Sequence, residues 1–163
     1  MSLSRKSVKH SPRYKDHRPL QDKDWQEEAK KDIVNFFAAH KADVQVSLKI
    51  LSGPKQKEFF SIVSYLIGRL EPKFAKTLNN DSQDIDFLIS CLKGRKYPYV
   101  PTKQAFGYVA SPAHWPPMLG MLHFLVKLCE RSEESEKRMA LEARCPVCSH
   151  FRFFVQLSTT MSV

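Results

Sequence analysis

Hydrophobic residues recur at helical spacing in four segments of the chain, and turn residues or proline separate these segments. The first segment runs from about 22 to 41. Asp22 is a suitable N-cap, and the acidic residues that follow suit the positive end of a helix. The apolar positions fall on one face and are Trp25, Ala29, Ile33, Phe36 and Phe37. This pattern predicts an amphipathic helix.

The second segment, from about 54 to 70, is apolar on most of its sides, which predicts a central buried helix. Pro54 suits its first turn, and the pair Glu71 and Pro72 ends it. A polar loop is expected over 73–81.

The third helix should begin with Asp81 or Ser82 as its cap and stop at Gly94. The fourth should start near Pro116 and carry a row of leucines on its inner face. No alternation of strands and helices is present. The predicted fold class is therefore all-α, with four main helices, short helices and structured loops.

Two stretches have less regular patterns. "VQVSLKIL" (44–51) alternates apolar and polar residues, which predicts a short strand, although a small helix is equally compatible with a helical domain. "GRKYPYVPTKQAFGYVASPAHWPPMLGML" (94–122) holds five prolines and a central Lys103. Proline fixes backbone angles and the aromatic residues can pin the chain, so this stretch predicts a stiff connection packed on the helices.

The net charge of +9 is concentrated near the N-terminus. Residues 1–19 carry six Lys or Arg and one Asp, so they contribute +5. Residues 1–18 contain too few apolar side chains to bury and are predicted to be a disordered basic tail. A basic tail on a mildly basic domain indicates a polyanionic partner, although a solubilising tail has the same composition.

The bulk composition narrows the class of protein. The length of 163 residues suggests one domain with tails, and no apolar run approaches the roughly 20 residues that span a membrane. The basic start is not followed by an apolar stretch, so no secretory signal is expected. The four cysteines do not suggest a disulfide framework, which favours a cytosolic or nuclear protein.

No enzyme is predicted, because the chain lacks a phosphate-binding loop, a nucleophile elbow and a zinc-protease motif. "CPVCSH" (145–150) gives Cys145, Cys148 and His150 the spacing of metal ligands. A structural zinc site needs four ligands, and no second pair of this kind exists. No metal or other cofactor is therefore expected.

Three ordered stretches resemble a known family. They are "DHRPLQDKDWQEEAKKDIVNFFAAH", "VSLKILSGPKQKEFFSIVSYLIGRLEP" and "KGRKYPYVPTKQAFGYVASPAHWPPMLGML". Together they resemble the globular head of the HEC ("highly expressed in cancer") family of outer-kinetochore proteins. The resemblance covers residues 16 to about 130 and rests on ordered motifs such as "RPL.DK", "YP" and "P..WP".

The resemblance implies a calponin-homology domain over 19–131 and a microtubule-binding role at the kinetochore in the nucleus, during chromosome segregation. It implies two protein partners, tubulin and a paralogous calponin-homology subunit, and an Aurora-type kinase that acts on the tail. Neither a membrane nor a small-molecule substrate is expected. Family members continue as a long coiled coil, so we expect 132–163 to hold a helix extension and an unassigned segment that stops before that coil.

The family's microtubule-binding lysines correspond to Lys23, Lys49, Lys57, Lys93 and Lys103 of this sequence. A family histidine before the tryptophan of "P..WP" is replaced here by Ala113, and His114 follows one position later as a possible additional contact. Two serines of the tail, Ser7 and Ser11, stand two positions after a basic residue. This spacing makes them candidate phosphorylation sites.

Two other functions remain open. The positive charge suits a nucleic-acid-binding domain, but the chain shows no aromatic residues interleaved along a basic element. A calponin-homology domain could instead bind actin, although such domains usually act as tandem pairs and this chain has room for one.

Overall fold

A computed structural model describes residues 16–74 and 77–144 of the chain. Every regular element in this part is helical, which confirms the all-α prediction. The elements are α1 (Lys23–Ala39), α2 (Leu48–Leu51), α3 (Gln56–Leu70), the 3-10 helix η1 (Pro72–Phe74), α4 (Ser82–Gly94), α5 (Lys103–Gly107) and α6 (Trp115–Arg144). None of the described helices is long and apolar enough to cross a membrane.

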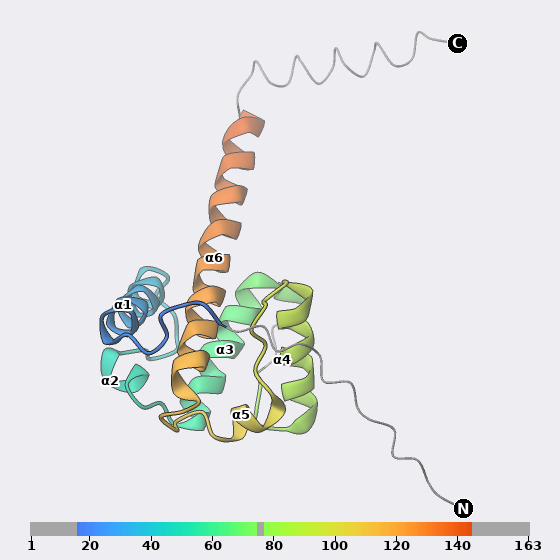
Figure 1. The fold of residues 1–163 in the computed structure, drawn as a ribbon. Coiled ribbons are helices and arrows are strands. Elements are labelled where there is room, and N and C mark those ends of the chain that lie inside the picture. The colour runs from blue at the N-terminus through green and yellow to red at the C-terminus, as the bar shows by residue number, and fades with distance from the viewer. Residues whose placement is uncertain (1–15, 75–76, 145–163) are drawn as a thin grey trace, which may run out of the picture.

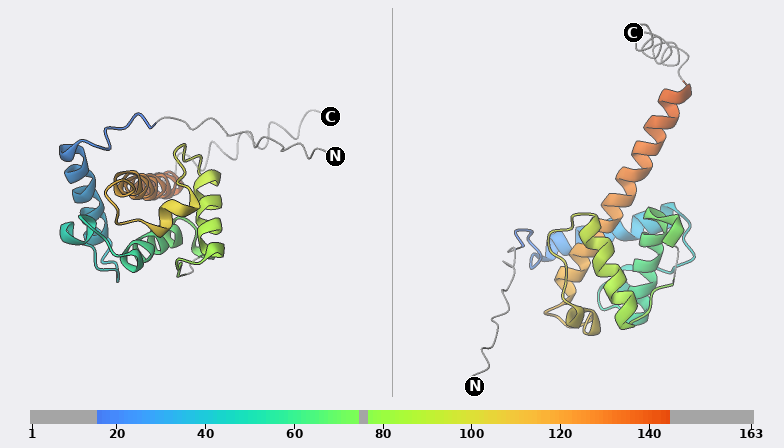
Figure 2. Two further views of the ribbon diagram at one scale, coloured as in Figure 1. Left: turned by 60° about the horizontal axis from the view of Figure 1, so that its bottom comes forward. Right: turned by 90° about the vertical axis from the view of Figure 1, so that its right-hand side faces the viewer.

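The first half of α6 is the axis of the domain, and the other helices surround it (Figures 1 and 2). This half is lined by side chains that are fully buried, among them Met118, Leu119, Leu122, Leu125 and Val126. The second half leaves the domain as a single projecting helix with exposed side chains, including Met139 and Leu141. The change from apolar to charged residues along α6 therefore marks the point where the helix leaves the core.

The second helix of the core is α3, as its apolar sequence predicts. Six of its side chains are buried, namely Phe59, Phe60, Ile62, Val63, Leu66 and Ile67. It packs against α6, and the thiol of Cys129 in α6 lies 3.7 Å from the carbonyl oxygen of Leu66. The two helices that the sequence marks as most apolar thus form the centre of the molecule.

The predicted helix boundaries agree with the observed ones to within about two residues. Asp22 caps α1 through its side chain, which accepts a hydrogen bond from the N–H of Asp24 at 2.9 Å. Asp81 stands at the N-cap of α4, and Gly94 is its last residue. These ends are predictable because caps and stops act within a few residues of the helix terminus.

The "VQVSLKIL" stretch is divided between an extended segment and a helix. Val44 and Val46 pack against the core, and Ser47 then caps the short helix α2 by accepting a hydrogen bond from the N–H of Ile50. The structure therefore selects the small helix for 48–51. No second strand lies beside this segment within the described residues, so an extended chain has no ladder of hydrogen bonds to join.

The proline-rich stretch between α4 and α6 packs on the domain as predicted, because Tyr97, Phe106 and Trp115 are all buried. It also contains α5, and η1 lies where a polar loop was expected to begin. Both are single turns whose apolar residues are too few to show a helical period.

The segment that precedes α1 lies on the domain from Asp16 onward. The disordered tail was predicted to extend to residue 18, whereas Asp16 and Arg18 make hydrogen bonds in the structure, and Leu20 is buried. Residues 1–15, the main part of the predicted tail, lie outside the described residues, as does the stretch beyond Arg144.

Candidate functional site

Two of the predicted lysines lie on neighbouring elements at one end of the domain. Lys57 is exposed in the first turn of α3, and Lys103 is the first residue of α5. The side-chain amide of Gln56 donates a hydrogen bond of 3.0 Å to the carbonyl oxygen of Phe106, which joins the start of α3 to α5. Figure 1 shows this end of the domain opposite the projecting half of α6.

Lys103 is half-exposed and forms an ion pair with Asp86 of α4. Its Nζ lies 2.6 Å from the Oδ2 of Asp86, and about half of each side chain remains accessible. The ion pair connects α5 to α4. A carboxylate of a binding partner would have to compete with Asp86 for this ammonium group.

Lys23 and Lys49 are exposed and lie on the neighbouring helices α1 and α2. Lys23 is the first residue of α1, where the capping Asp22 and the following Asp24 flank it. These acidic residues suit the helix dipole but lower the positive potential at Lys23. Lys49 has no acidic residue within five positions on either side in the sequence.

Lys93 lies in the last turn of α4 and is exposed. Seven residues separate it from Asp86, which places it roughly 10 Å further along the helix axis. The end of α4 lies toward the projecting half of α6, away from the start of α3 (Figure 1). The structure thus brings Lys57 and Lys103 into one region and places Lys93 at the opposite end of α4.

His114 belongs to the turn that begins α6. Its Nδ1 lies 2.7 Å from the Oγ of Ser111, and its ring is 6.4 Å from the ring of Tyr108, which is largely exposed. The N–H of Trp115 donates a hydrogen bond to the carbonyl oxygen of Ser111. His114 is therefore half-buried and engaged in the turn, beside an exposed aromatic ring.

The remaining predicted residues lie outside the described part of the chain. They are the candidate phosphorylation sites Ser7 and Ser11 and the weak metal-ligand set Cys145, Cys148 and His150. Within residues 16–74 and 77–144, no group of three His, Cys, Asp or Glu side chains could hold a metal ion.

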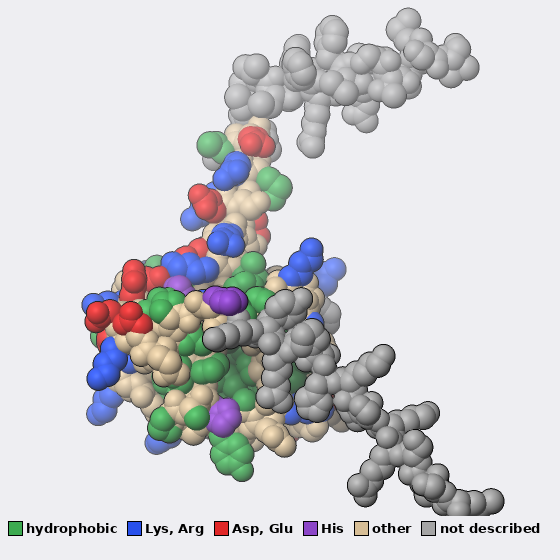
Figure 3. Space-filling model, in the orientation of Figure 1, with side chains coloured by type: hydrophobic (Ala, Val, Ile, Leu, Met, Phe, Trp, Pro, Cys, Tyr) green, Lys and Arg blue, Asp and Glu red, His purple; other side chains and the backbone are tan. Residues whose placement is uncertain are grey.

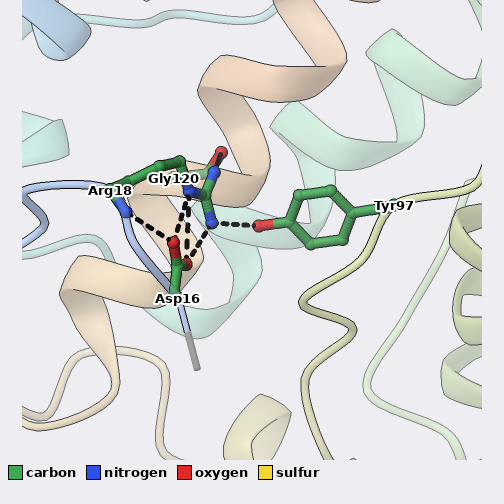
Figure 4. Close-up of polar contacts among 4 residues, drawn as sticks. All are labelled: Asp16, Arg18, Tyr97 and Gly120. Atoms are coloured by element: carbon green, nitrogen blue, oxygen red, sulfur yellow. Dashed lines mark hydrogen bonds and ion pairs between the residues drawn. The ribbon is translucent and has the colours of Figure 1, made fainter. Parts of the chain in front are cut away.

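The sequence patterns missed a polar cluster around Arg18, which Figure 4 shows. The guanidinium group donates hydrogen bonds to both carboxylate oxygens of Asp16, to the hydroxyl of Tyr97 at 2.7 Å and to the carbonyl oxygen of Gly120 at 2.9 Å. It also lies over the rings of Tyr97 and Tyr99, 5.4 and 4.8 Å from their centroids. Arg18 therefore joins three parts of the chain that are distant in sequence.

Burial and charge act in opposite directions in this cluster. Burial disfavours the charged form of Asp16, but the hydrogen bonds and charge of Arg18 outweigh it and hold the pKa of that carboxyl below its ordinary value. Burial raises the pKa of the Tyr97 hydroxyl, against the opposing effect of Arg18. At neutral pH the cluster is therefore an ionised pair with a neutral phenol.

Gly120 is part of the same arrangement, because the side chains of Leu20 and Arg18 lie close to α6 at this position. A Cβ atom there would lie 2.9 Å from Cδ2 of Leu20 and 3.0 Å from Nη1 of Arg18. A side chain at this position would therefore require the ends of the Leu20 and Arg18 side chains to shift. The motifs "RPL.DK" and "YP" were the signals in the sequence that touched this cluster, through Arg18 and Tyr97.

Charged side chains of both signs cover the projecting half of α6, which Figure 3 shows as an extended rod with few apolar groups. The two large apolar side chains that are exposed there are Met139 and Leu141. Glu133 still contacts the domain through His40 and Arg69, and every side chain from Glu134 to Glu142 is exposed.

Sequence comparison gives a consistent set of relatives. Residues 24–140 match the model of the HEC/Ndc80p family. The chain is 33% identical over 119 residues to the probable kinetochore protein NDC80 of Candida albicans, a match that covers 69% of this chain and 15% of the relative.

Similar values hold for two other fungal proteins. The chain is 31% identical over 123 residues to the kinetochore protein ndc80 of Schizosaccharomyces pombe, covering 74% of this chain and 19% of the relative. It is 32% identical over 121 residues to the kinetochore protein NDC80 of Saccharomyces cerevisiae, covering 69% and 16%. The chain thus spans less than a fifth of the length of these relatives.

Proposed function

This chain belongs to the HEC/Ndc80p family, and from that premise we propose that it is a non-enzymatic microtubule-binding head of the kinetochore. In this role it couples chromosomes to spindle microtubules in the nucleus. The observation that carries the proposal is the pair Lys57 and Lys103, which lie on adjoining elements at one end of the domain.

Exposed lysines suit an acidic protein surface such as that of tubulin. Each contact between an exposed lysine and a carboxylate contributes only roughly 0.2–1 kcal/mol. Lys49 has no acidic neighbours in the sequence. It should therefore attract a tubulin carboxylate more strongly than Lys23, whose positive potential is lowered by Asp22 and Asp24. Lys93, toward the other end of α4, is an outlying contact, whereas His114 lies beside Tyr108 at the end of α5. Binding by one head is therefore weak, and many heads on one lattice are needed for a firm attachment.

The basic segment before Asp16 supplies the second part of the interface. Residues 1–15 carry five Lys or Arg and no acidic residue. Phosphorylation of Ser7 or Ser11 by an Aurora-type kinase would add about −1.5 to −2 charges at each site. Two such events remove most of the segment's charge of +5, which weakens its attraction to tubulin.

The projecting half of α6 supports a role in assembly with a paralogous subunit. A helix exposed on all sides gains no packing energy, and isolated helices are marginal in water. We assign this half to the start of a coiled coil with the paralogous calponin-homology subunit, in which Met139 and Leu141 contribute apolar contacts.

Co-sedimentation with microtubules at low ionic strength tests the proposed function. The variant Lys57→Ala/Lys103→Ala should bind roughly 2- to 30-fold more weakly, because two contacts of 0.2–1 kcal/mol each are removed. The control is Lys73→Ala/Lys137→Ala, which removes the same charge from η1 and from the projecting half of α6. Equal affinity of the two double variants would contradict the proposal.

The same preparation distinguishes the competing functions. Pelleting with actin filaments and a gel shift with duplex DNA at physiological salt should both show weaker binding than microtubules. Preferential pelleting with actin, or a sequence-specific gel shift, would replace the proposed function with one of the two alternatives.

A further inference from the structure

A hollow with a volume of about 420 Å³ lies between the C-terminal half of α1 and the segment that leads into α2. The two helices contact one another on one side of α6 (Figures 1 and 2). The large apolar side chains that line this α1–α2 hollow are Val34, Phe37, Val44, Val46 and Ile50. All of them except Phe37 are only partly buried. The described part of the chain therefore leaves an apolar surface open to solvent here.

The size of the α1–α2 hollow suits a short peptide. The wall from Val34 to Ala38 is roughly 6 Å long, because each helical residue rises 1.5 Å. Lys41 also lines the hollow and extends this wall past the end of α1. An extended chain rises about 3.3 Å per residue, so two or three of its residues span the wall. The volume falls within the range of roughly 300–1,000 Å³ that is usual for ligand pockets.

The backbone of the opposite wall has free hydrogen-bonding groups. Among the described residues, none donates a hydrogen bond to Asp43, Val44, Gln45 or Val46, or accepts one from them. These four residues precede the cap of α2 and belong to neither helix. Their N–H and C=O groups are therefore available to the main chain of a peptide that lies along the wall, as well as to water.

The rim of the α1–α2 hollow is positively charged. Lys41 lines it, Lys31 lies three residues before Val34 on the same side of α1, and Lys49 belongs to α2. All three lysines are exposed, and none forms an ion pair with another described residue. Asp43 is the only acidic residue between Lys41 and Lys49 in the sequence. The rim should therefore attract carboxylates.

We propose that the α1–α2 hollow binds an acidic peptide segment of another protein, in which apolar side chains alternate with carboxylates. The apolar side chains would enter the hollow, and the carboxylates would lie against the lysines of the rim. Charge complementarity favours this partner, because the lysines repel a basic peptide and find no partner in a purely apolar one. Of the lysines assigned to tubulin above, Lys49 alone borders the hollow, so the proposal does not depend on microtubule binding.

Lys41 offers a substitution that adds no backbone strain. Its φ of 45° lies in the left-handed region, which favours glycine. Lys41→Gly therefore removes the charge and suits the backbone. Lys96 has a φ of 57° at the end of α4, on the other side of α6 from the hollow (Figure 1). Lys96→Gly is consequently a matched control for both the charge and the backbone.

Fluorescence anisotropy with labelled peptides tests the proposal on the full chain. The probe is a short peptide of alternating glutamate and leucine, and two comparison peptides replace its leucines by serine or its glutamates by lysine. The glutamate–leucine peptide should bind about ten-fold more tightly than either, because a buried leucine side chain contributes that much or more. Lys41→Gly should weaken its binding about 1.5- to 5-fold, the range for one exposed ion pair. Lys96→Gly should leave it unchanged.

Two neighbouring alanines of α1 test the position of the site. Ala38 lines the α1–α2 hollow and is exposed, whereas Ala39 is exposed but does not line it. Ala38→Glu places a bulky carboxylate at the hollow and should weaken binding of the glutamate–leucine peptide several-fold. Ala39→Glu adds the same charge and should have little effect. Circular dichroism shows that both variants keep their helices.

Several results would overturn the proposal. If the glutamate–leucine peptide does not bind, or binds no better than the glutamate–serine peptide, the hollow is not an apolar site. Equal binding of the lysine–leucine peptide would reject an acidic partner, and equal effects of Ala38→Glu and Ala39→Glu would reject the location. Analytical ultracentrifugation tests for a different occupant. Self-association that Ala38→Glu abolishes and Ala39→Glu preserves would show that a second copy of the chain covers the hollow.

Discussion

Single residues decide how much of the positive charge is available to a partner. Lys57 and Lys103 have the same charge, yet Lys103 is paired with Asp86 and its Nζ lies 2.6 Å from the carboxylate. An exposed ion pair of this kind contributes little stability, so Asp86 mainly lowers the local potential. The distribution of acidic neighbours therefore matters as much as the position of the lysines.

Asp86→Asn should strengthen microtubule binding at low ionic strength. Removal of the carboxylate frees Lys103, and a gain of roughly 1.5- to 5-fold follows from the usual energy of an exposed pair. Co-sedimentation measures the change, with Asp43→Asn, an exposed residue of the α1–α2 connection, as the control for net charge. An equal gain in affinity for Asp86→Asn and Asp43→Asn would show that net charge, and not the release of Lys103, causes the change.

At the level of elements, α6 joins two different environments within one helix. Leu125 is fully buried between the surrounding helices, whereas Leu141 is about three-quarters exposed on the projecting half. The same residue type therefore contributes to folding at one position and is available for assembly at the other.

Leu125→Ala should lower the free energy of unfolding by roughly 2–5 kcal/mol, because it leaves a cavity in the core. Leu141→Ala is the matched control and should change the stability of the isolated chain by less than about 0.5 kcal/mol. Urea denaturation measures both. A similar loss in the two variants would mean that the projecting half of α6 packs on the domain.

At the scale of the whole molecule, ionic contacts around the apolar core join α6 to α1 and to α3. Asp32 of α1 binds Lys127 and His123 of α6 at 2.9 and 3.1 Å. Glu133 of α6 receives hydrogen bonds from His40 and from Arg69 of α3. Because each pair lies at the rim of the core, these contacts fix the helices relative to one another more than they add to stability.

These contacts predict an acid-sensitive fold. Hydrogen bonds from Lys127 lower the pKa of Asp32, and those from His40 and Arg69 lower that of Glu133 against the opposing effect of burial. A lowered pKa in the folded state contributes stability that is present above the ordinary values of 3.8 and 4.5 and is lost as the pH falls through the folded values.

Asp32→Asn/Glu133→Gln should therefore flatten the decline of stability between about pH 5 and pH 2, the range in which paired carboxylates become protonated. It should also make the chain less stable at pH 7. Thermal unfolding measured across this range provides the test, with Glu142→Gln on the projecting half of α6 as the control. If stability falls as steeply with decreasing pH in the double variant as in the control, then groups other than Asp32 and Glu133 cause most of the acid sensitivity.

The sequence alone determined the helical framework of this protein. Helical periodicity, Asp22 and Asp81 as caps, and Gly94 as a stop are local signals, and each acts over one or two turns. The apolar character of 54–70 likewise marked α3 as the central helix. Lysine positions could be named through the family resemblance, since the motifs that carry them are contiguous in sequence.

Only the tertiary structure decided which charges are paired and where the N-terminal segment begins. Lys103 meets Asp86 across 17 residues, and Arg18 meets Tyr97 and Gly120 across 79 and 102 residues. The composition of 1–18 is the same whether Arg18 is free or docked, because docking depends on the carbonyl oxygen that Gly120 presents and on the hydroxyl of Tyr97. Such contacts are set by packing between distant segments and leave no periodic trace in the sequence.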